Sequence, residues 1–261
     1  MRHFSLERYW QGASPVHRLD PRLKLLAALA YVLVTSSVPA RGCWALLALG
    51  VLALGAALAS EIPVHVTIRR SMIVLPFAGM AAVSLPFTRT GDVVWAWRPF
   101  VWAVTVTDEG LLAFASVVVR AWLSGWVGGL LVATTPFPSL LRAMRALHVP
   151  SALTTILSFT YRYLHVLVVE ATRLQTAREA RSAGPGGSLA WRVRVLGGMI
   201  GSLFIRSYER SERIYAAMLS RGFSGQMRTL DELTWRAADT WAALGWGALL
   251  AAIAIAGWVP C

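Results

Sequence analysis

Lysine, acidic residues and cysteine are scarce in this sequence. The scarcity of lysine and that of cysteine each exclude a class of protein, and the scarcity of acidic residues leaves the chain strongly basic. The 25 basic residues are 24 arginines and one lysine, Lys24, against 13 Asp and Glu, so the formal net charge is +12. A P-loop ATPase needs a lysine after its glycines, in the pattern GxxxxGK followed by Ser or Thr. Lys24 has no glycines at that spacing. The chain by itself is therefore not a P-loop ATPase.

The cysteine and histidine patterns argue against the common metal and catalytic sites. Cys43 and Cys261 are the only cysteines, and they have neither CxxC spacing nor nearby histidine partners, so the sequence supports no zinc site and no disulfide framework. It also lacks an HExxH pair and a nucleophile with a neighbouring base. We expect no catalytic residue, no metal ligand and no cofactor-binding residue in this chain, and therefore no enzyme.

Long apolar segments are what the chain has in abundance. Its composition is 56% hydrophobic and its mean hydropathy is +0.57, which is too apolar for a water-soluble protein. A membrane-spanning helix needs about 20 mainly apolar residues, or somewhat fewer where flanking cations snorkel. Five segments meet that need: 22–38, 43–60, 72–87, 111–133 and 237–259. Pro76 and Pro86 predict that the third segment is broken or tilted.

The arginines orient these segments. Five cations precede or begin the first segment, Arg69 and Arg70 follow the second, and residues 134–236 contain fourteen arginines, so 21 of the 25 cations lie on one side. The positive-inside rule then places the N-terminus in the cytoplasm and the C-terminus outside. This placement explains the net charge better than nucleic acid does, so we expect a lipid bilayer and no nucleic acid as partner. Arg120, inside the fourth segment, is expected to pair with a carbonyl or with a partner.

Two segments outside the expected spans have patterns of their own. In the outside loop 88–110, aromatic residues recur in twos around Pro99, which predicts a short hairpin at the membrane interface. Residues 134–236 contain two series of apolar or small residues at alternating spacings of three and four, each typical of one helix seam. The first series is Leu157, Thr160, Leu164, Leu167, Ala171 and Leu174. The second is Leu189, Val193, Leu196, Ile200, Leu203 and Ser207, followed after seven residues by Ile214 and Ala217. Glycines at 184, 186 and 187 predict a turn between two helices, each about 45 Å long.

Several short strings, taken together, carry a family resemblance. They are Asp20-Pro21-Arg22-Leu23-Lys24-Leu25, Thr107-Asp108-Glu109-Gly110-Leu111, Thr134-Thr135-Pro136, Thr160-Tyr161-Arg162-Tyr163-Leu164 with Glu170-Ala171, and Ala217-Met218-Leu219-Ser220-Arg221-Gly222-Phe223. In this order they resemble the CbiQ family, the transmembrane T components of energy-coupling factor (ECF) transporters, in the cobalt and nickel branch.

The resemblance implies a fold and its division into parts. The expected fold is all-α: a polytopic membrane helical bundle of about five transmembrane helices, with a cytoplasmic coupling domain of two long crossed helices. Residues 1–133 would form the membrane bundle, with four helices and the outside hairpin loop. Residues 134–236 would form the coupling domain, and residues 237–261 the C-terminal transmembrane helix.

The resemblance also implies partners and a site. The partners would be two ABC ATPase subunits and a substrate-binding membrane subunit, with an additional small membrane component in some complexes, and these partners would bind ATP and the metal ion. In the family, each long helix ends in an Ala-Arg-Gly-type motif whose arginine docks on an ATPase subunit. The matching positions are Ala180-Arg181-Ser182 and Ser220-Arg221-Gly222, in which Ser replaces Gly at 182 and Ala at 220.

Other interpretations of the same residues remain open. An arginine near a helix C-terminus can simply complement the helix dipole, which is worth about 0.3–1 kcal/mol. The cargo could be a vitamin, because the substrate site is expected in another subunit. The helix pair could also belong to a membrane scaffold that binds a partner other than an ATPase.

Overall fold

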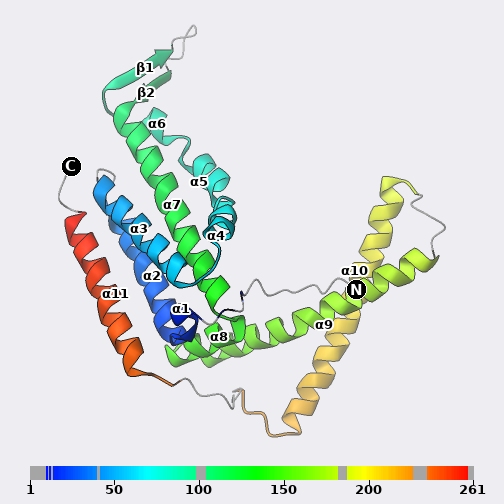
Figure 1. The fold of residues 1–261 in the computed structure, drawn as a ribbon. Coiled ribbons are helices and arrows are strands. Elements are labelled where there is room, and N and C mark those ends of the chain that lie inside the picture. The colour runs from blue at the N-terminus through cyan, green and yellow to red at the C-terminus, as the bar shows by residue number, and fades with distance from the viewer. Residues whose placement is uncertain are drawn as a thin grey trace.

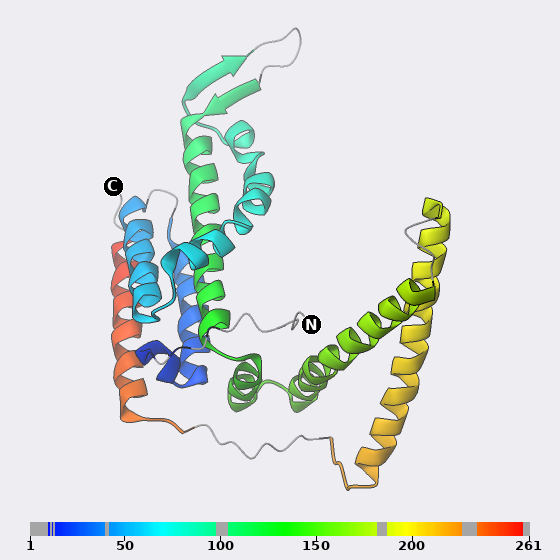
Figure 2. The same ribbon diagram turned by 45° about the vertical axis from the view of Figure 1, so that its right-hand side comes forward.

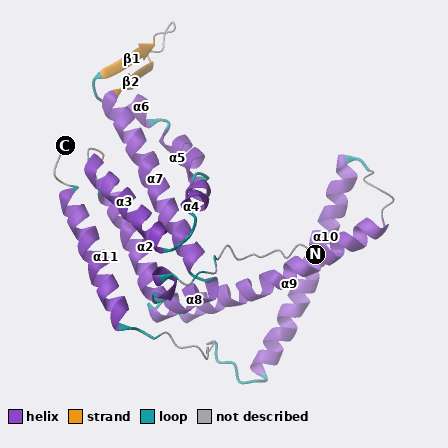
Figure 3. Cartoon of the chain, viewed as in Figure 1, coloured by secondary structure: helices purple, strands orange, loops and turns teal. Residues whose placement is uncertain are grey.

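The fold is a bundle of helices with a second, smaller group of helices at its side (Figure 1). In this computed structural model the described residues are 10, 12, 14–39, 42–97, 104–181, 187–225 and 234–257; the side chains of 93–97, 104 and 105 are not described. Almost all of the described elements are helical, with one short pair of strands (Figure 3). The predicted all-α class is thus confirmed.

The bundle contains most of the elements. They are α1 (Pro15–Arg18), α2 (Pro21–Ser37), α3 (Cys43–Ala59), α4 (Val64–Ser71), α5 (Val74–Ala82), α6 (Leu85–Thr88), β1 (Val93–Trp97), β2 (Val104–Thr107), α7 (Asp108–Thr134) and α11 (Ala237–Ala256). The chain between α7 and α11 forms α8 (Phe137–Ala146), α9 (Ser151–Arg181) and α10 (Leu189–Leu219).

The core of the bundle lies where α2, α3 and α7 meet. Small and branched residues recur about every four positions along α3, at Ala45, Leu49, Ala53 and Ala57, and all of them are buried. This spacing puts them on one helix face. Their small size allows close approach to α2, whose buried Tyr31 donates a hydrogen bond from its hydroxyl to the Leu49 carbonyl at 3.0 Å. This hydrogen bond ties α2 to α3 inside the core.

The third expected span is broken, as the sequence predicts. It consists of α4, α5 and α6 in place of one helix, and it begins at Val64, eight residues before the predicted start. Pro76 lies in the first turn of α5 and Pro86 in the first turn of α6. Proline is tolerated there because the backbone N–H that it lacks would have no intrahelical partner. The two prolines therefore start new helix segments.

The predicted hairpin after this span is also present. Strands β1 and β2 pair antiparallel, with Val93 opposite Thr107 and Trp97 opposite Val104. Residues 98–103, which include most of the predicted turn, lie outside the described residues. The hairpin stands at the far end of α7 from α8 (Figures 1 and 3).

Length and composition allow four described segments to cross a membrane: Val64–Thr88, Asp108–Thr134, Ser151–Arg181 and Ala237–Ala256. This set differs from the five predicted spans. Helices α2 and α3 have 17 residues each, about 26 Å at 1.5 Å per residue, slightly less than the ~30 Å hydrocarbon core. Helix α9 is long and apolar enough to span, but it stands beside the bundle in both views (Figures 1 and 2). Within the bundle, α2, α3, α4–α6, α7 and α11 alternate in direction.

Helices α9 and α10 have 31 residues each and cross one another at the side of the bundle (Figure 2). The predicted seams meet only at this crossing. In the first half of α10 the seam residues Leu189 and Ile200 are 78% and 67% exposed. Two helices that cross diverge on either side of the contact, so residues more than a few turns away have no partner in the pair.

Candidate coupling site

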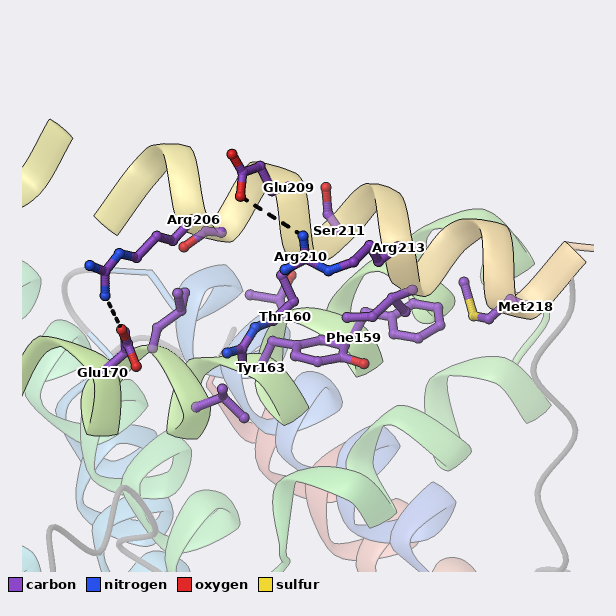
Figure 4. A pocket seen from close by; sticks show the side chains of 14 residues that line it. Phe159, Thr160, Tyr163, Glu170, Arg206, Glu209, Arg210, Ser211, Arg213 and Met218 are labelled. Carbon is purple, nitrogen blue, oxygen red and sulfur yellow. Dashed lines mark hydrogen bonds and ion pairs between the residues drawn. The ribbon is translucent and has the colours of Figure 1, made fainter. Parts of the chain in front are cut away.

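The crossing of α9 and α10 forms a cavity of about 520 Å³ (Figure 4). Its apolar lining includes Phe159 and Leu167 from α9 and Ile214 and Met218 from α10. Its polar lining comes mainly from α10, including Arg206, Arg210 and Arg213. The pair is therefore joined by mixed contacts around an open space and has no dry, close-packed core.

One ion pair bridges the two helices at this crossing. The Arg206 Nη1 atom lies 2.8 Å from Glu170 Oε1, which makes a hydrogen bond and an ion pair (Figure 4). The side chains are 58% and 22% exposed, respectively. Solvent therefore screens the interaction, and its contribution to stability is about 0.2–1 kcal/mol. Glu170 is one of the residues in the family strings, and its position at the crossing gives it a structural role there.

The base of α9 is tied to the bundle through α8. The rings of Phe137, at the start of α8, and Tyr161, on α9, lie with their centroids 4.8 Å apart. The α8–α9 turn is closed by His148, whose φ of 63° lies in the left-handed region. Its neighbour Val149 donates a backbone hydrogen bond to the Met144 carbonyl, which is a helix-terminating arrangement. Helix α9 is therefore joined to α8 by a ring contact and by a hydrogen-bonded turn.

The expected docking residues lie at the ends of the two long helices. Ala180 and Arg181 are the last two residues of α9, and Arg181 is exposed; Ser182 lies outside the described residues. Ser220 is the C-cap of α10, and Arg221 and Gly222 form the turn that follows it. The two helix ends point in different directions from the crossing (Figures 1 and 2). Two separate, exposed arginines thus mark the two ends.

The end of α10 depends on its glycine. Gly222 has a φ of 76°, and the Phe223 N–H donates to the Met218 carbonyl while the Gly222 N–H donates to the Leu219 carbonyl. A left-handed residue at this position is the usual way to terminate a helix, and glycine adopts it without a steric penalty. Gly222 therefore ends the helix directly after Arg221, so this arginine stands at the tip and not inside a longer helix.

Buried polar groups connect α2 to both ends of the segment that contains α8, α9 and α10. The Lys24 Nζ atom donates to the carbonyl of Thr134, the last residue of α7, at 3.3 Å and to that of His17 at 3.1 Å. The Asp20 N–H donates to Asp239 Oδ1, in the first turn of α11, at 3.0 Å. Lys24, Asp20 and Asp239 are all buried. We call Asp20, Lys24, Thr134 and Asp239 the junction cluster.

The family string that begins at Thr107 shapes the other end of α7. The Thr107 hydroxyl accepts from the Gly110 N–H at 3.3 Å, as an N-cap does, and donates to the Arg89 carbonyl at 2.9 Å. A Cβ added to Gly110 would stand 2.7 Å from Pro86 Cα. This string therefore binds α7 closely to α6.

Arg120 occupies the middle of α7. Its Nε and Nη2 atoms are buried and have no hydrogen-bond partner among the described residues. A charged side chain at the centre of a membrane helix costs about 2.5–3.5 kcal/mol on insertion scales. An arginine in this position, without a partner in the described part of the chain, is an unsatisfied group.

Comparison with known proteins assigns the family. A family model described as "Cobalt transport protein", CbiQ, matches residues 12–230. The chain belongs to the CbiQ family. The "Energy-coupling factor transporter transmembrane protein EcfT" of Acidaminococcus fermentans is 29% identical to this CbiQ-family chain over 265 residues, 97% of each protein. The "Cobalt transport protein CbiQ" of Rhodobacter capsulatus is 30% identical over 155 residues, 59% of this chain and 63% of the relative.

Membership in the CbiQ family makes the chain an ECF-type T component, an energy-coupling transmembrane subunit of a transporter. Its relatives are transporter membrane components and not enzymes. The family and the apolar helices together place it in a membrane as an integral protein. As a T component it works in a complex with other ECF subunits.

Sequence reasoning missed two residues of this CbiQ-family site. Arg206 appeared only as one of many arginines, yet it forms the ion pair across the crossing. Asp239 falls within the expected last span, 237–259, where no sequence pattern assigns it a role, yet it is 2% exposed and forms part of the junction cluster. The signal for Asp239 was available, because an acidic residue in the first turn of a membrane helix needs an interfacial or polar partner.

Proposed function

We propose that the chain couples ATP hydrolysis in two ABC ATPase subunits to movement of a substrate-binding membrane subunit, in an importer of cobalt or nickel ions. The observation that carries the proposal is the crossed pair α9–α10, with an exposed arginine at the C-terminal end of each helix. The planar guanidinium group can make several directed hydrogen bonds to carboxylates or to carbonyls at a helix end. Arg181 and Arg221 therefore offer two similar contacts to two similar ATPase subunits.

The contacts within the chain supply a mechanical path. When ATP brings the two ATPase subunits together, the tips at Arg181 and Arg221 move, and each helix acts as a lever about 45 Å long. The Glu170–Arg206 pair joins the levers at the crossing. The ring contact between Tyr161 and Phe137 passes the motion to α8. The junction cluster then holds both ends of the moving segment against α2, so the bundle moves with it.

Sidedness follows from the same proposal. Helices α8 to α10 contain most of the arginines of residues 134–236, and we place this side in the cytoplasm, where the ATPase subunits are. The hairpin and the end of α11 then lie outside. An N-terminus in the cytoplasm and a C-terminus outside agree with an odd number of bundle segments.

The cargo site is proposed to belong to the substrate-binding partner. In the described part of this chain, no group of three or more His, Cys, Asp and Glu residues could hold a metal ion. The name of the Rhodobacter capsulatus relative supports cobalt. A vitamin as cargo is the second candidate, because the relatives named EcfT, which cover most of this chain, have no metal in their names.

The test is charge reversal at the two tips. Losing one partner of a desolvated, hydrogen-bonded charge pair commonly costs 2–5 kcal/mol, so Arg181→Glu, Arg221→Glu and above all the double variant should lose ATPase co-purification and ion uptake. Arg192→Glu is the matched control, because Arg192 is an exposed arginine elsewhere on α10 and surface changes of this kind stay within about 0.5 kcal/mol. If the double variant assembled and transported at the wild-type rate, coupling would not pass through these arginines. Co-purification of partners other than ATPases would favour the scaffold alternative.

A further inference from the structure

Arg120 lies on the helix face of α7 that packs into the bundle. Ser116, Leu123 and Val127 stand four residues before it and three and seven residues after it, and all three are buried. These spacings place them on the same face as Arg120. Arg120 as a whole is only partly buried, although its Nε and Nη2 atoms are buried. Lipid-facing arginines that snorkel lie near helix ends, whereas Arg120 is about 18 Å from the start of α7.

No carboxylate among the described residues forms an ion pair with this guanidinium. The acidic residues within these helices are Asp108 and Glu109, in the first turn of α7, and Asp239, in the first turn of α11. Asp239 belongs to the junction cluster at the opposite end of α7 from the hairpin, and Asp108 is twelve residues from Arg120. Nε and Nη2 of Arg120 remain without a partner among the described residues. The counter-charge is therefore absent from this part of the chain.

The surface beside Arg120 suits another membrane helix. Toward the hairpin, α7 extends beyond α2, α3 and α11, and only α5 and α6 run beside it there (Figures 1 and 2). Along this half of α7, Leu112 and Val119 on one side of the Arg120 face and Val117 on the other are 36–48% exposed. An apolar surface next to one buried cation is complementary to an apolar helix that carries one acidic residue, because the carboxylate would satisfy a charge that lipid cannot.

We propose that Arg120 forms an ion pair, within the membrane, with an Asp or Glu carboxylate on a transmembrane helix of another subunit of the complex. This inference rests on the multi-subunit transporter proposed above. It assigns to Arg120 the task of holding a membrane partner, which is distinct from the contacts of Arg181 and Arg221 with the ATPase subunits. The guanidinium has the geometry for a bidentate contact with a carboxylate.

The sign of a stability change tests the pair. In the purified single chain, Arg120→Met removes an unsatisfied charge and should raise the midpoint of thermal unfolding in detergent by about 2 °C or more. In the complex expressed with its native partners, the same variant leaves the partner's carboxylate unpaired. It should reduce co-purification of a membrane subunit by about tenfold or more while the ATPase subunits are retained. Arg89→Met, at an exposed arginine near the hairpin, should change neither quantity.

A covalent test identifies the partner. Lys24 is the only lysine of the natural chain, and its Nζ is bound to two carbonyls. Arg120→Lys therefore adds one amine in the membrane, and a hydrophobic carbodiimide can join that amine to a neighbouring carboxylate through an amide bond. We expect a cross-linked peptide between position 120 and an acidic residue of another membrane subunit, absent from wild type.

Specific results would overturn the inference. A lower midpoint for Arg120→Met in the single chain, with the membrane partner fully retained, would mean that Arg120 is satisfied inside its own chain. A cross-link confined to this chain, or no cross-link together with unchanged retention, would exclude a carboxylate partner and leave lipid phosphate as the counter-ion. If the wild-type chain assembled with no ATPase or membrane subunit at all, the proposed function would fail and this inference with it. If the wild-type chain assembled with its partners, and Arg120→Met changed neither the unfolding midpoint nor the retention of the membrane subunit, this inference alone would be overturned.

Discussion

The carboxylate of Asp239 accepts a hydrogen bond from the backbone N–H of Asp20 at 3.0 Å, across 219 positions of sequence. Its second oxygen accepts from the Arg236 N–H at 2.9 Å. One buried side chain thus caps the N-terminus of α11 and links it by a hydrogen bond to the start of α2. The long helices α9 and α10 leave and rejoin the bundle between two anchored points, at Thr134 and at Asp239.

Asp239→Asn should weaken this junction. The amide can replace only one of the two acceptor oxygens, and a buried N–H that loses its partner costs about 1–3 kcal/mol. We expect the midpoint of thermal unfolding of the purified chain to fall by about 2–8 °C. Asp92→Asn, at an exposed carboxylate beside the hairpin, is the control and should leave the midpoint unchanged. An equal midpoint for both variants would show that the Asp239 charge and its second acceptor are dispensable.

The Glu170–Arg206 pair should show a small coupling energy that depends on salt. Because the arginine side chain is 58% exposed, a double-mutant cycle with Glu170→Gln and Arg206→Gln should give about 0.2–1 kcal/mol at low ionic strength, decreasing as salt is added. The measurement is chemical or thermal unfolding of the four proteins. Additive single-variant effects at low salt would mean that the pair does not hold the crossing.

Gly222→Ala and Gly198→Ala should change the stability of α10 in opposite directions. Gly222 has a φ of 76°, where a side chain costs about 1–2 kcal/mol. Gly198 is helical and a Cβ there meets nothing within 4 Å, so alanine should gain about 0.8–1 kcal/mol of helix propensity. Hydrogen exchange across α10 reports both effects. Faster exchange near Arg221 should appear only in Gly222→Ala, and equal exchange in the two variants would contradict the assigned helix end.

Gly110→Ala should separate α7 from α6. The added Cβ would stand 2.7 Å from Pro86 Cα and 2.8 Å from the Leu85 carbonyl oxygen, and forcing an extra methyl group into a packed contact costs about 1–3 kcal/mol. Gly128→Ala is the matched control in the same helix, because nothing lies within 4 Å of its added Cβ. Thermal unfolding should be lowered in the first variant alone. If both variants were equally stable, the α6–α7 contact would accommodate the added methyl group without loss of stability.

Cysteine labelling can test the sidedness of the chain. In a background without Cys43 and Cys261, Ser182→Cys should react from the cytoplasmic side of a sealed membrane and Gly91→Cys from the outside. The expectation rests on 21 of the 25 cations lying on the proposed cytoplasmic side. Labelling of both positions from the same side would refute the alternating arrangement of the bundle segments.

The breaks and ends of the helices could be predicted from the sequence because they depend on local chemistry. Pro76 and Pro86 divide the third span since proline cannot donate the backbone hydrogen bond inside a helix. Gly222 ends α10 since it adopts a positive φ without strain. Apolar runs of about 20 residues and the distribution of arginine likewise predicted an integral membrane protein, because burial in lipid depends on composition over a whole segment.

The contacts between distant residues were decided only by the tertiary structure. The seams of α9 and α10 predicted two helices that face each other along their length. A seam does not determine the crossing angle, and the two helices meet only around their crossing, between Phe159 and Glu170 on α9 and between Arg206 and Met218 on α10. Likewise, one arginine among 24 could not be singled out as the partner of Glu170, and Asp20, Lys24 and Asp239 are joined only when the bundle closes. Helix boundaries follow from interactions over one turn. The ion pair and the junction cluster instead join residues that are far apart in the sequence, and their proximity depends on how the whole chain folds, which local sequence does not determine.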